Sequence, residues 1–384
     1  MTIYLDHAAA TPVDRAVAAA MCEALTDPQL QANPAATHAA GEAARGRVEQ
    51  ARAEVAALIG AAAGEIVWTS GATESNNLAL IGAARLRAGR GRHLVTAASE
   101  HASVLAACDE LERQGFAVTR LPTDPMGIVE PAVVAAALRP DTTLVSLMQV
   151  NNETGVVQDI AAIGTLCRER GVLLHVDAAQ AAGREAIDVR ALQVDLLSLS
   201  AHKMYGPKGI GALFISRETV RRVEPVLVGG GQERGLRPGT VATHQVIGMG
   251  VAARLAAGRR VEDCARLVPL REALWAGVSR LPGVFLNGHP QRRACHILNV
   301  SVAGIEGESL LHALRELAVS SGAACAAESA EPSAVLRLLG RSPELAQGAI
   351  RFSLGRVTTA VEVARAVEVF VTGVERLRRL APPA

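Results

Sequence analysis

The sequence predicts an α/β fold with a mainly parallel central sheet flanked by helices, and a second, smaller α+β domain. Two observations support this class. Between residues 60 and 260, short apolar runs alternate with helical patterns, as in right-handed βαβ units. The chain has 384 residues, more than one hydrophobic core usually serves. Since the pattern changes near residue 258, we expect a large domain over 13–257 and a small domain over 1–12 and 258–384.

Short runs rich in apolar and branched residues predict the strands of the large domain. They lie at 65–69, 93–96, 143–148, 172–176, 195–199 and 211–215. A helix through Leu78 to Leu86 follows the first strand. In the small domain we expect a helix over 261–281, strands near 283–286 and 296–302, and helices around Leu310 and over 361–377.

Polar clusters follow four of these strands. They are Ser99–His101, Asn151–Glu153, Asp177–Gln180 and Ser200–Lys203. The carboxyl ends of parallel strands share one edge of an open α/β sheet, and ligands bind there. The four clusters are therefore predicted to converge on one crevice.

The chain contains only two lysines, Lys203 and Lys208, among its 39 basic residues, and both lie within one ten-residue segment. Arginine can replace lysine where a solvated charge is wanted, but a guanidinium cannot act as an amine nucleophile. The clustering predicts a lysine that is needed as an amine. The alternative is that codon bias favoured arginine and two lysines survived by chance.

Two further features point to the ligand. Residues 70–76, Ser-Gly-Ala-Thr-Glu-Ser-Asn, join a strand to a helix, and a glycine with free N–H groups at a helix start favours phosphate. An ordinary turn with a helix cap is the alternative, and no Walker or dinucleotide fingerprint is present. Asp177 directly follows a hydrophobic strand, so it requires a cation or hydrogen bonds, although a helix-capping role is equally compatible. Phosphate site, carboxylate and lysine together describe a pyridoxal phosphate site.

The six cysteines are scattered and form no paired C-x-x-C metal motif. Five of them lie in helical or strand-like stretches and are expected to be small buried hydrophobic residues: Cys22, Cys108, Cys167, Cys264 and Cys295. Cys325 lies instead in a run of small residues, where an accessible thiol is plausible. Its local sequence leaves a reactive and a structural role open.

Composition excludes several function classes. The net charge of +1 gives no electrostatic argument for nucleic acid or an anionic membrane. No apolar run is long enough to span a bilayer. The first residues lack the basic and apolar regions of a secretory signal, so we expect a cytoplasmic protein.

Several motifs together resemble one family. They are Gly-Ala-Thr-Glu-Ser-Asn (71–76), Asn-Asn-Glu-Thr-Gly (151–155), His-Val-Asp-Ala-Ala-Gln (175–180) and Ser-Ala-His-Lys-Met-Tyr-Gly-Pro-Lys-Gly-Ile-Gly (200–211). The match runs from Ile-Tyr-Leu-Asp-His-Ala-Ala-Ala-Thr-Pro (3–12) to Ile-Arg-Phe-Ser-Leu-Gly-Arg (350–356). The chain resembles the cysteine desulfurases of the class V aminotransferase family, of the housekeeping iron–sulfur type. These are fold-type I enzymes that depend on pyridoxal 5′-phosphate.

The resemblance implies roles for particular residues. Lys203 would bind the cofactor covalently and transfer protons, Asp177 would pair with the pyridine nitrogen, and His101 would stack on the ring and assist protonation. The remaining cofactor contacts would be Asn152 and Gln180 on the ring substituents, Ala72, Thr73, Ser200 and His202 on the phosphate, and Thr240 on the phosphate of a neighbouring subunit in a homodimer. Arg351 and Asn152 would bind the substrate.

The implied reaction removes sulfur from L-cysteine, giving L-alanine and a persulfide on Cys325, which passes sulfur to an acceptor protein. The acceptor would be an iron–sulfur scaffold or a thiolation protein. The loop reads Ala-Ala-Cys-Ala-Ala-Glu where the housekeeping relatives usually carry hydroxyl residues, and the chain ends without their longer tail for scaffold docking. The alternatives are a selenocysteine lyase, a non-catalytic sulfur-carrier or assembly subunit, and an ordinary aminotransferase.

Overall fold

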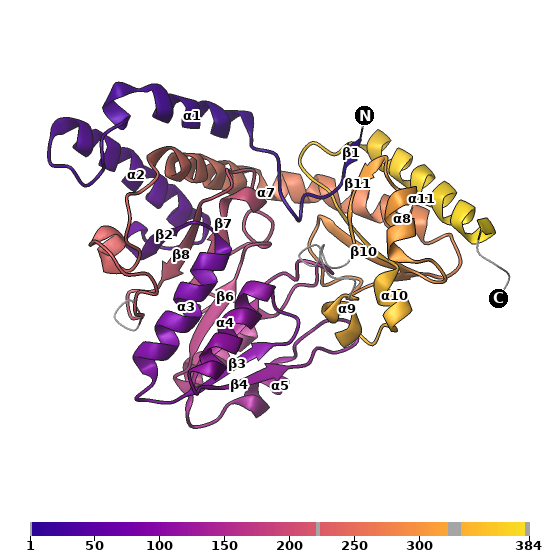
Figure 1. Ribbon diagram of the computed structural model, residues 1–384, viewed down its shortest axis with the longest axis horizontal. Helices are drawn as coiled ribbons and strands as arrows, with labels where there is room; N and C mark the ends of the chain where they lie inside the picture. The colour runs from indigo at the N-terminus through magenta and orange to yellow at the C-terminus, as the bar shows by residue number, and fades with distance from the viewer. Residues whose placement is uncertain (1, 220–222, 322–331, 381–384) are drawn as a thin grey trace.

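The computed structural model describes residues 2–219, 223–321 and 332–380. Its largest element is a seven-stranded sheet with the order β2-β8-β7-β6-β5-β3-β4 (Figure 1). The strands are β2 (Ile66–Thr69), β3 (His93–Ala97), β4 (Ala117–Leu121), β5 (Thr142–Met148), β6 (Leu173–Asp177), β7 (Leu196–Ser200) and β8 (Gly211–Ile215). Strands β4, β3, β5, β6 and β7 pair in parallel, while β8 pairs antiparallel with β7 and β2. The expected mainly parallel α/β sheet is confirmed.

Alternate residues of the strands face two helical layers. Leu144 of β5 packs in one core cluster with residues of α3 and α4, whereas its neighbour Val145 packs in another with residues of α2, α6 and α7. This period of two places strands that are apolar on both faces between two layers of helices. The helices are α1 (Arg15–Thr26), α2 (Ala39–Leu58), α3 (Ala72–Arg87), α4 (Ala102–Arg113), α5 (Pro131–Ala137), α6 (Ile160–Arg170) and α7 (Thr243–Val278).

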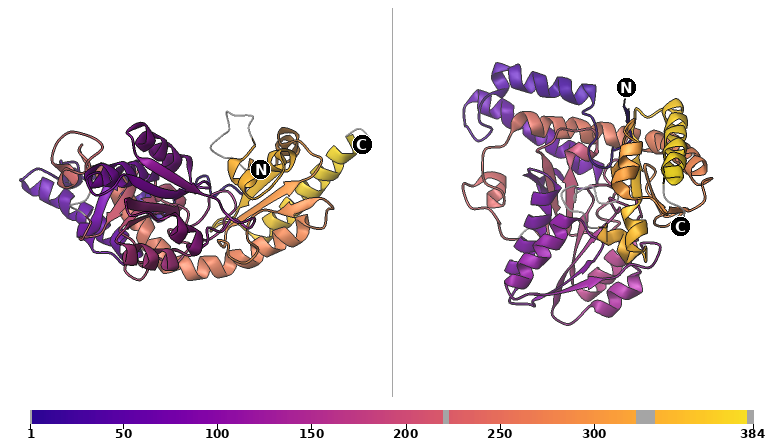
Figure 2. Two further views of the ribbon diagram at one scale, coloured as in Figure 1. Left: turned by 90° about the horizontal axis from the view of Figure 1, so that it is seen from below. Right: turned by 45° about the vertical axis from the view of Figure 1, so that its right-hand side comes forward.

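Helix α7 runs from the large sheet to the small one (Figures 1 and 2). Its first half contributes Met249 and Ala253 to the core of the large sheet, and its second half contributes Leu274 to the core of the small one. The predicted start of this helix at residue 261 is therefore wrong by several turns. The first half shows no amphipathic stripe because it is covered on several sides: Gly250 lies so close to Ala51 of α2 that a Cβ atom there would be 2.6 Å from it.

The small sheet has the order β12-β13-β10-β9 and is antiparallel. The elements of this part are β9 (Val284–Leu286), β10 (Ile297–Val302), β12 (Ser320–Ser321), β13 (Ala349–Ser353), α8 (Gly307–Ala313), α9 (Ala334–Leu338), α10 (Pro343–Gln347) and α11 (Ala360–Leu380). A separate two-stranded pair joins β1 (Ile3–Tyr4) to β11 (Leu317–Ala318). Both chain ends thus lie in this part of the molecule (Figure 1). The division of the chain at residue 257 stays a prediction, and that position lies inside α7.

Candidate active site

A cavity of about 630 Å³ lies at the carboxyl ends of β3, β5, β6 and β7. His101, Asn152, Asp177 and Lys203, one from each polar cluster that follows these strands, line it. The predicted convergence on one crevice is confirmed. The predicted site residues that line the cavity are Ala72, Thr73, His101, Asn152, Asp177, Gln180, Ser200, His202, Lys203 and Arg351.

Lys203 enters the cavity from a short 3₁₀ turn, Ala201–Lys203, that directly follows β7. Its Nζ donates hydrogen bonds to the backbone oxygens of Ala8 at 2.6 Å and Ala9 at 2.9 Å. The N-terminal segment is held here from its other side, because the Thr11 hydroxyl donates to the His202 carbonyl at 2.9 Å. The segment before α1 is thus one wall of the cavity and orients the lysine amine.

Asp177 ends β6 and is buried, with 6% of its surface exposed. Asn76 of α3 donates from Nδ2 to its Oδ2 at 2.8 Å, and the Ala179 N–H donates to its Oδ1 at 2.9 Å. Both carboxyl oxygens of Asp177 thus accept a hydrogen bond, which fixes the orientation of the side chain. The contact from Asn76 was not predicted. The motif around residues 71–76 contained the residue, but nothing in its spacing indicated that it faces Asp177.

The opposite end of the cavity is built from the start of α3 and the end of β7. Gly71 precedes α3 and supplies no side-chain cap to its N–H groups; a Cβ at Gly71 would lie 3.9 Å from the Ser200 Oγ. The Nδ1 of His202 is buried without a hydrogen-bond partner. Burial, with help from the positive Lys203 and Lys208, lowers the pKa of His202 to about 4. A neutral imidazole, a hydroxyl and a helix start therefore surround space that suits a phosphate.

Three other polar residues, His101, Gln180 and Asn152, line the cavity. His101 caps α4, and its Nδ1 lies 2.8 Å from the Ser103 Oγ. Gln180 donates from Nε2 to the Ala8 carbonyl at 2.8 Å. Asn152 lines the cavity from the loop that follows β5. These contacts fix two polar side chains, His101 and Gln180, at the cavity that also contains Lys203 and Asp177.

Arg351 reaches the cavity from β13 of the small sheet and is 1% exposed. Its Nη1 donates to the Asn152 carbonyl at 2.8 Å, and its Nη2 donates to Asp6 at 2.9 Å and to the Ser320 hydroxyl at 3.1 Å. Its Nε is buried without a partner. A guanidinium so placed can receive a carboxylate in a bidentate manner.

Glu153 was not predicted as a site residue. It follows Asn152, whose carbonyl accepts a hydrogen bond from Arg351. Burial raises its pKa to about 7, against the opposing effects of a hydrogen bond from Ser333 and the positive charges of Arg351 and His101. Glu100 behaves similarly: burial and the negative Asp177 raise its pKa, against a hydrogen bond from the Met148 N–H. No sequence pattern distinguishes such carboxylates from exposed ones, because their burial comes from distant segments.

Two predicted residues do not line the cavity formed by the described part of one chain. Thr240 is exposed, and Cys325 lies outside the described residues. The expectation that the other cysteines are buried is confirmed for Cys108, Cys167 and Cys295 but is wrong for Cys22, which is exposed, and for Cys264, which is half-buried. Both lie on exposed or partly covered helix faces, which an alanine-rich pattern does not distinguish from buried ones.

These donors fit pyridoxal phosphate. The cavity combines an amine, a buried carboxylate, and the start of a helix beside a buried imidazole nitrogen that has no hydrogen-bond partner. Among the described residues, no group of three or more His, Cys, Asp and Glu side chains could hold a metal ion. Nor does any helix in the described ranges have the length and apolar character needed to cross a membrane.

The family model for class-V aminotransferases matches residues 3–366. The chain belongs to this family. Within it, the cysteine desulfurases IscS of Shewanella halifaxensis and of Pseudomonas aeruginosa are 51% and 52% identical to it over 383 residues, which is all of this chain and 95% of each relative. The expected relationship to cysteine desulfurases is confirmed.

Solved structures show the same fold. A NifS-like protein superimposes with a TM-score of 0.90 at 33% identity, covering 98% of this chain and 100% of its own. SspA in complex with cysteine superimposes with a TM-score of 0.81 at 37% identity, covering 92% of this chain and 99% of its own. The expected fold-type I architecture is confirmed, and with the family comes the expected cofactor, pyridoxal 5′-phosphate.

Proposed function

We infer that this protein is a cysteine desulfurase that removes sulfur from L-cysteine with bound pyridoxal phosphate and forms L-alanine. The observation that carries the inference is the meeting of Lys203, Asp177 and Arg351 in one cavity. The full-length relatives named cysteine desulfurase support it. A sulfur-carrier or assembly subunit without catalysis would have no use for this set of side chains.

Bound pyridoxal phosphate supplies an electron sink for the α-carbon of an amino acid. Lys203 would hold the cofactor covalently, and its amine would carry the α-proton of the substrate. Asp177, which accepts a hydrogen bond from Asn76, would pair with the pyridine nitrogen. His101 would face the ring, Asn152 and Gln180 would bind its substituents, and the start of α3 with Ser200 and His202 would hold the phosphate.

Arg351 binds the α-carboxylate of cysteine, with Asn152 beside it. Desolvation strengthens this pairing, because the guanidinium is buried and its Nε has no other partner. The carboxylate would compete with Asp6 for the Nη2 group. This anchor directs the substrate amine toward Lys203 and its sulfur toward the opening.

Cys325 accepts the sulfur. The described residues on both sides of its segment are anchored at the cavity: Ser320 hydrogen-bonds to Arg351, and Ser333 hydrogen-bonds to Glu153. Cys325 follows Ser321 by four residues in the sequence, and a chain of four residues spans at most about 14 Å. Its thiolate attacks the substrate sulfur, alanine leaves, and a persulfide remains on Cys325.

Sulfur then passes to an acceptor protein, an iron–sulfur scaffold or a thiolation protein. We also propose a homodimer in which Thr240 contacts the phosphate of the neighbouring subunit, because Thr240 is exposed and outside its own chain's cavity. The cytoplasmic location expected from the sequence stays a prediction.

The first test is incubation of the pyridoxal-phosphate-loaded protein with L-cysteine, with quantification of alanine and mass analysis of the Cys325 peptide. We expect alanine and one added sulfur on that peptide. Absence of alanine from loaded protein would contradict the inference. Turnover of α-keto acids would indicate an aminotransferase, and turnover of selenocysteine by the Cys325→Ala variant would indicate a selenocysteine lyase.

Two variants separate the roles of the amine and the thiol. Lys203→Ala should lose the visible absorption band of the covalently bound cofactor; an unchanged band would refute the assignment of the lysine. Cys325→Ala should keep the band and bind cysteine, yet release alanine far more slowly than the unaltered chain. Normal desulfuration by this variant would show that another group accepts the sulfur.

A further inference from the structure

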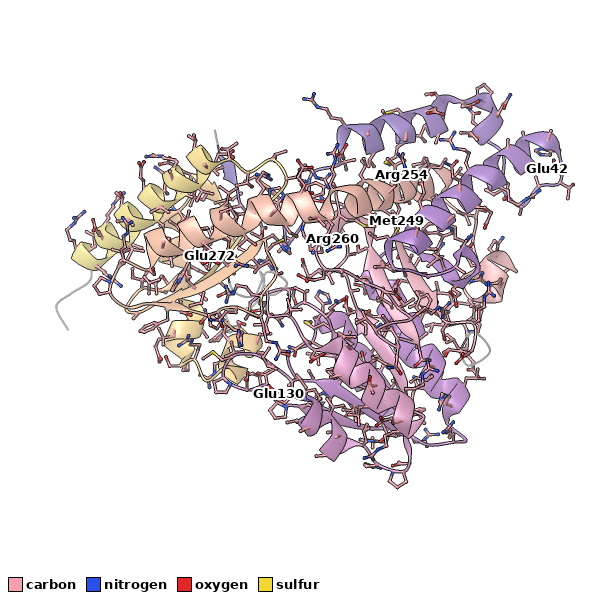
Figure 3. The ribbon with its side chains drawn as sticks, turned by 180° about the vertical axis from the view of Figure 1, so that it is seen from behind. Glu42, Glu130, Met249, Arg254, Arg260 and Glu272 are labelled. Carbon is pink, nitrogen blue, oxygen red and sulfur yellow. The ribbon has the colours of Figure 1, made fainter. Side chains whose placement is uncertain are left out.

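Two cysteine thiols meet outside the active site, where α7 crosses from the large sheet to the small one. The Sγ atoms of Cys264 and Cys295 lie 2.8 Å apart, and both residues are free thiols. Cys264 belongs to α7, in the stretch between the labelled Arg260 and Glu272 (Figure 3). Cys295 precedes β10 of the small sheet. Since a disulfide requires an S–S distance near 2 Å, a small approach of the two side chains would allow the bond.

The two thiols differ in accessibility. Cys264 is half-buried, whereas Cys295 is only 6% exposed. A reagent from solution therefore meets Cys264 first.

The two thiols also differ in the direction in which their surroundings shift the pKa. The hydrogen bond from Cys295 lowers the pKa of Cys264, and the positive Arg184 and Arg260 add to this effect, while burial and the negative Glu185 oppose it. The same hydrogen bond and burial raise the pKa of Cys295. Cys264 is thus the better nucleophile, and Cys295 is a protonated neighbour held against it.

The other buried cysteines lack this arrangement. Burial raises the pKa of both Cys108 and Cys167 to about 12. Each is therefore an inert core thiol. The pair at Cys264 and Cys295 is the part of the described chain where an accessible thiol and a second thiol lie within hydrogen-bond distance.

We propose that Cys264 and Cys295 form a redox-active dithiol that small-molecule disulfides oxidise to an intramolecular disulfide. The Cys264 thiolate attacks one sulfur of the reagent, a thiolate leaves, and a mixed disulfide remains. The Cys295 thiol then loses its proton to the departed thiolate and attacks the Cys264 sulfur, and the second thiolate leaves. The two protein thiols lose two electrons and the reagent gains them.

This site is connected to the active-site side of the chain through Arg184. The Cys264 Sγ lies 3.2 Å from the Arg184 backbone oxygen, and the buried Arg184 side chain donates to the Tyr205 hydroxyl at 3.0 Å. Tyr205 follows Lys203 by two residues. Oxidation would remove the Cys264 S–H group that donates to the Arg184 backbone oxygen and would link α7 covalently to the segment that enters β10.

The test uses the full-length, cofactor-loaded protein with oxidised glutathione as the probe. After alkylation of free thiols and digestion without reductant, we expect a peptide pair joined through Cys264 and Cys295 that is lighter by two hydrogens. Cys295→Ser should stop at a glutathione adduct on Cys264, and Cys22→Ser, the control at the exposed cysteine, should give the joined pair unchanged. The proposal is overturned if Cys264 stays reduced while Cys22 takes up glutathione.

A second measurement needs no variant. In the unaltered protein at pH 7, iodoacetamide should label Cys264 faster than the exposed Cys22, and prior treatment with oxidised glutathione should abolish labelling of Cys264 and Cys295 together. Slower labelling of Cys264 than of Cys22, or loss of labelling at only one member of the pair, would overturn the dithiol.

Discussion

Replacing Glu153 with glutamine should change how the stability of this protein depends on pH. The carboxyl is buried beside the cavity, and burial raises its pKa from 4.5 to about 7 in the folded chain. The unfolded chain therefore loses this proton at lower pH than the folded chain does. The protonated carboxyl imposes no cost below pH 4.5, the folded state loses stability as the pH rises from about 4.5 to about 7, and the loss is nearly complete above pH 7.

The size of the effect follows from the two pKa values. Full ionisation of Glu153 costs the folded state about 3 kcal/mol. At pH 5 the cost is about 1 kcal/mol and at pH 8 about 3 kcal/mol, so the loss between these pH values is about 2 kcal/mol. Glu153→Gln does not ionise and should be free of this loss.

Urea unfolding of the cofactor-loaded protein at a series of pH values from 5 to 8 measures the difference. The free energy of unfolding of Glu153→Gln relative to the unaltered chain should rise by about 2 kcal/mol over this range. Glu375→Gln, at an exposed carboxyl, is the matched control and should show no such rise. Equal pH dependence of Glu153→Gln and the unaltered chain would refute the reasoning.

Three other changes test the site and the core. Arg351→Lys loses the planar fork and should raise the KM for cysteine about tenfold with a smaller change in kcat; steady-state kinetics with an unchanged KM would contradict the carboxylate role. Asn76→Ala removes a hydrogen bond to the Asp177 carboxylate and should weaken pyridoxal phosphate binding about tenfold. A fluorescence titration that gives the native affinity would contradict this role of Asn76. Phe352→Ala removes an edge-to-face contact with Phe370, whose ring centroid lies 5.8 Å away. It should lower the free energy of unfolding by about 3–5 kcal/mol. A loss below about 1 kcal/mol in urea unfolding would show that the core of the small sheet tolerates the cavity.

The site could be predicted from the sequence to the extent that it depends on strand ends. His101, Asp177 and Lys203 each follow a buried parallel strand closely, so the fold class alone brings them to one edge. The motifs then supplied the family. The strands β3, β5, β6 and β7 were placed within a residue or two, because each is apolar on both faces and bounded by polar residues.

What the sequence could not predict depends on long-range contacts. Asn76 reaches Asp177, and Ala8 accepts hydrogen bonds from Lys203 and Gln180, across separations that no local pattern encodes. Strand β4 was missed because it is partly exposed and carries polar residues. The start of α7 was missed because α1 and α2 pack closely against it and leave room only for small residues such as glycine and alanine on several of its faces. The alternation of apolar and polar residues that predicts a helix is therefore absent there.

The continuity of α7 restricts how this chain can change in length. Each residue added to an α-helix rotates everything beyond it by about 100° and moves it about 1.5 Å along the axis. A single insertion between Ala256 and Leu267 would turn the face of α7 that packs on the small sheet away from that sheet. If the small sheet instead followed the helix, Arg351 would move away from Lys203. Among natural relatives, insertions and deletions should therefore accumulate in the loops and avoid this helix. Grafting a small domain from one relative onto another should succeed only when the helical register is preserved.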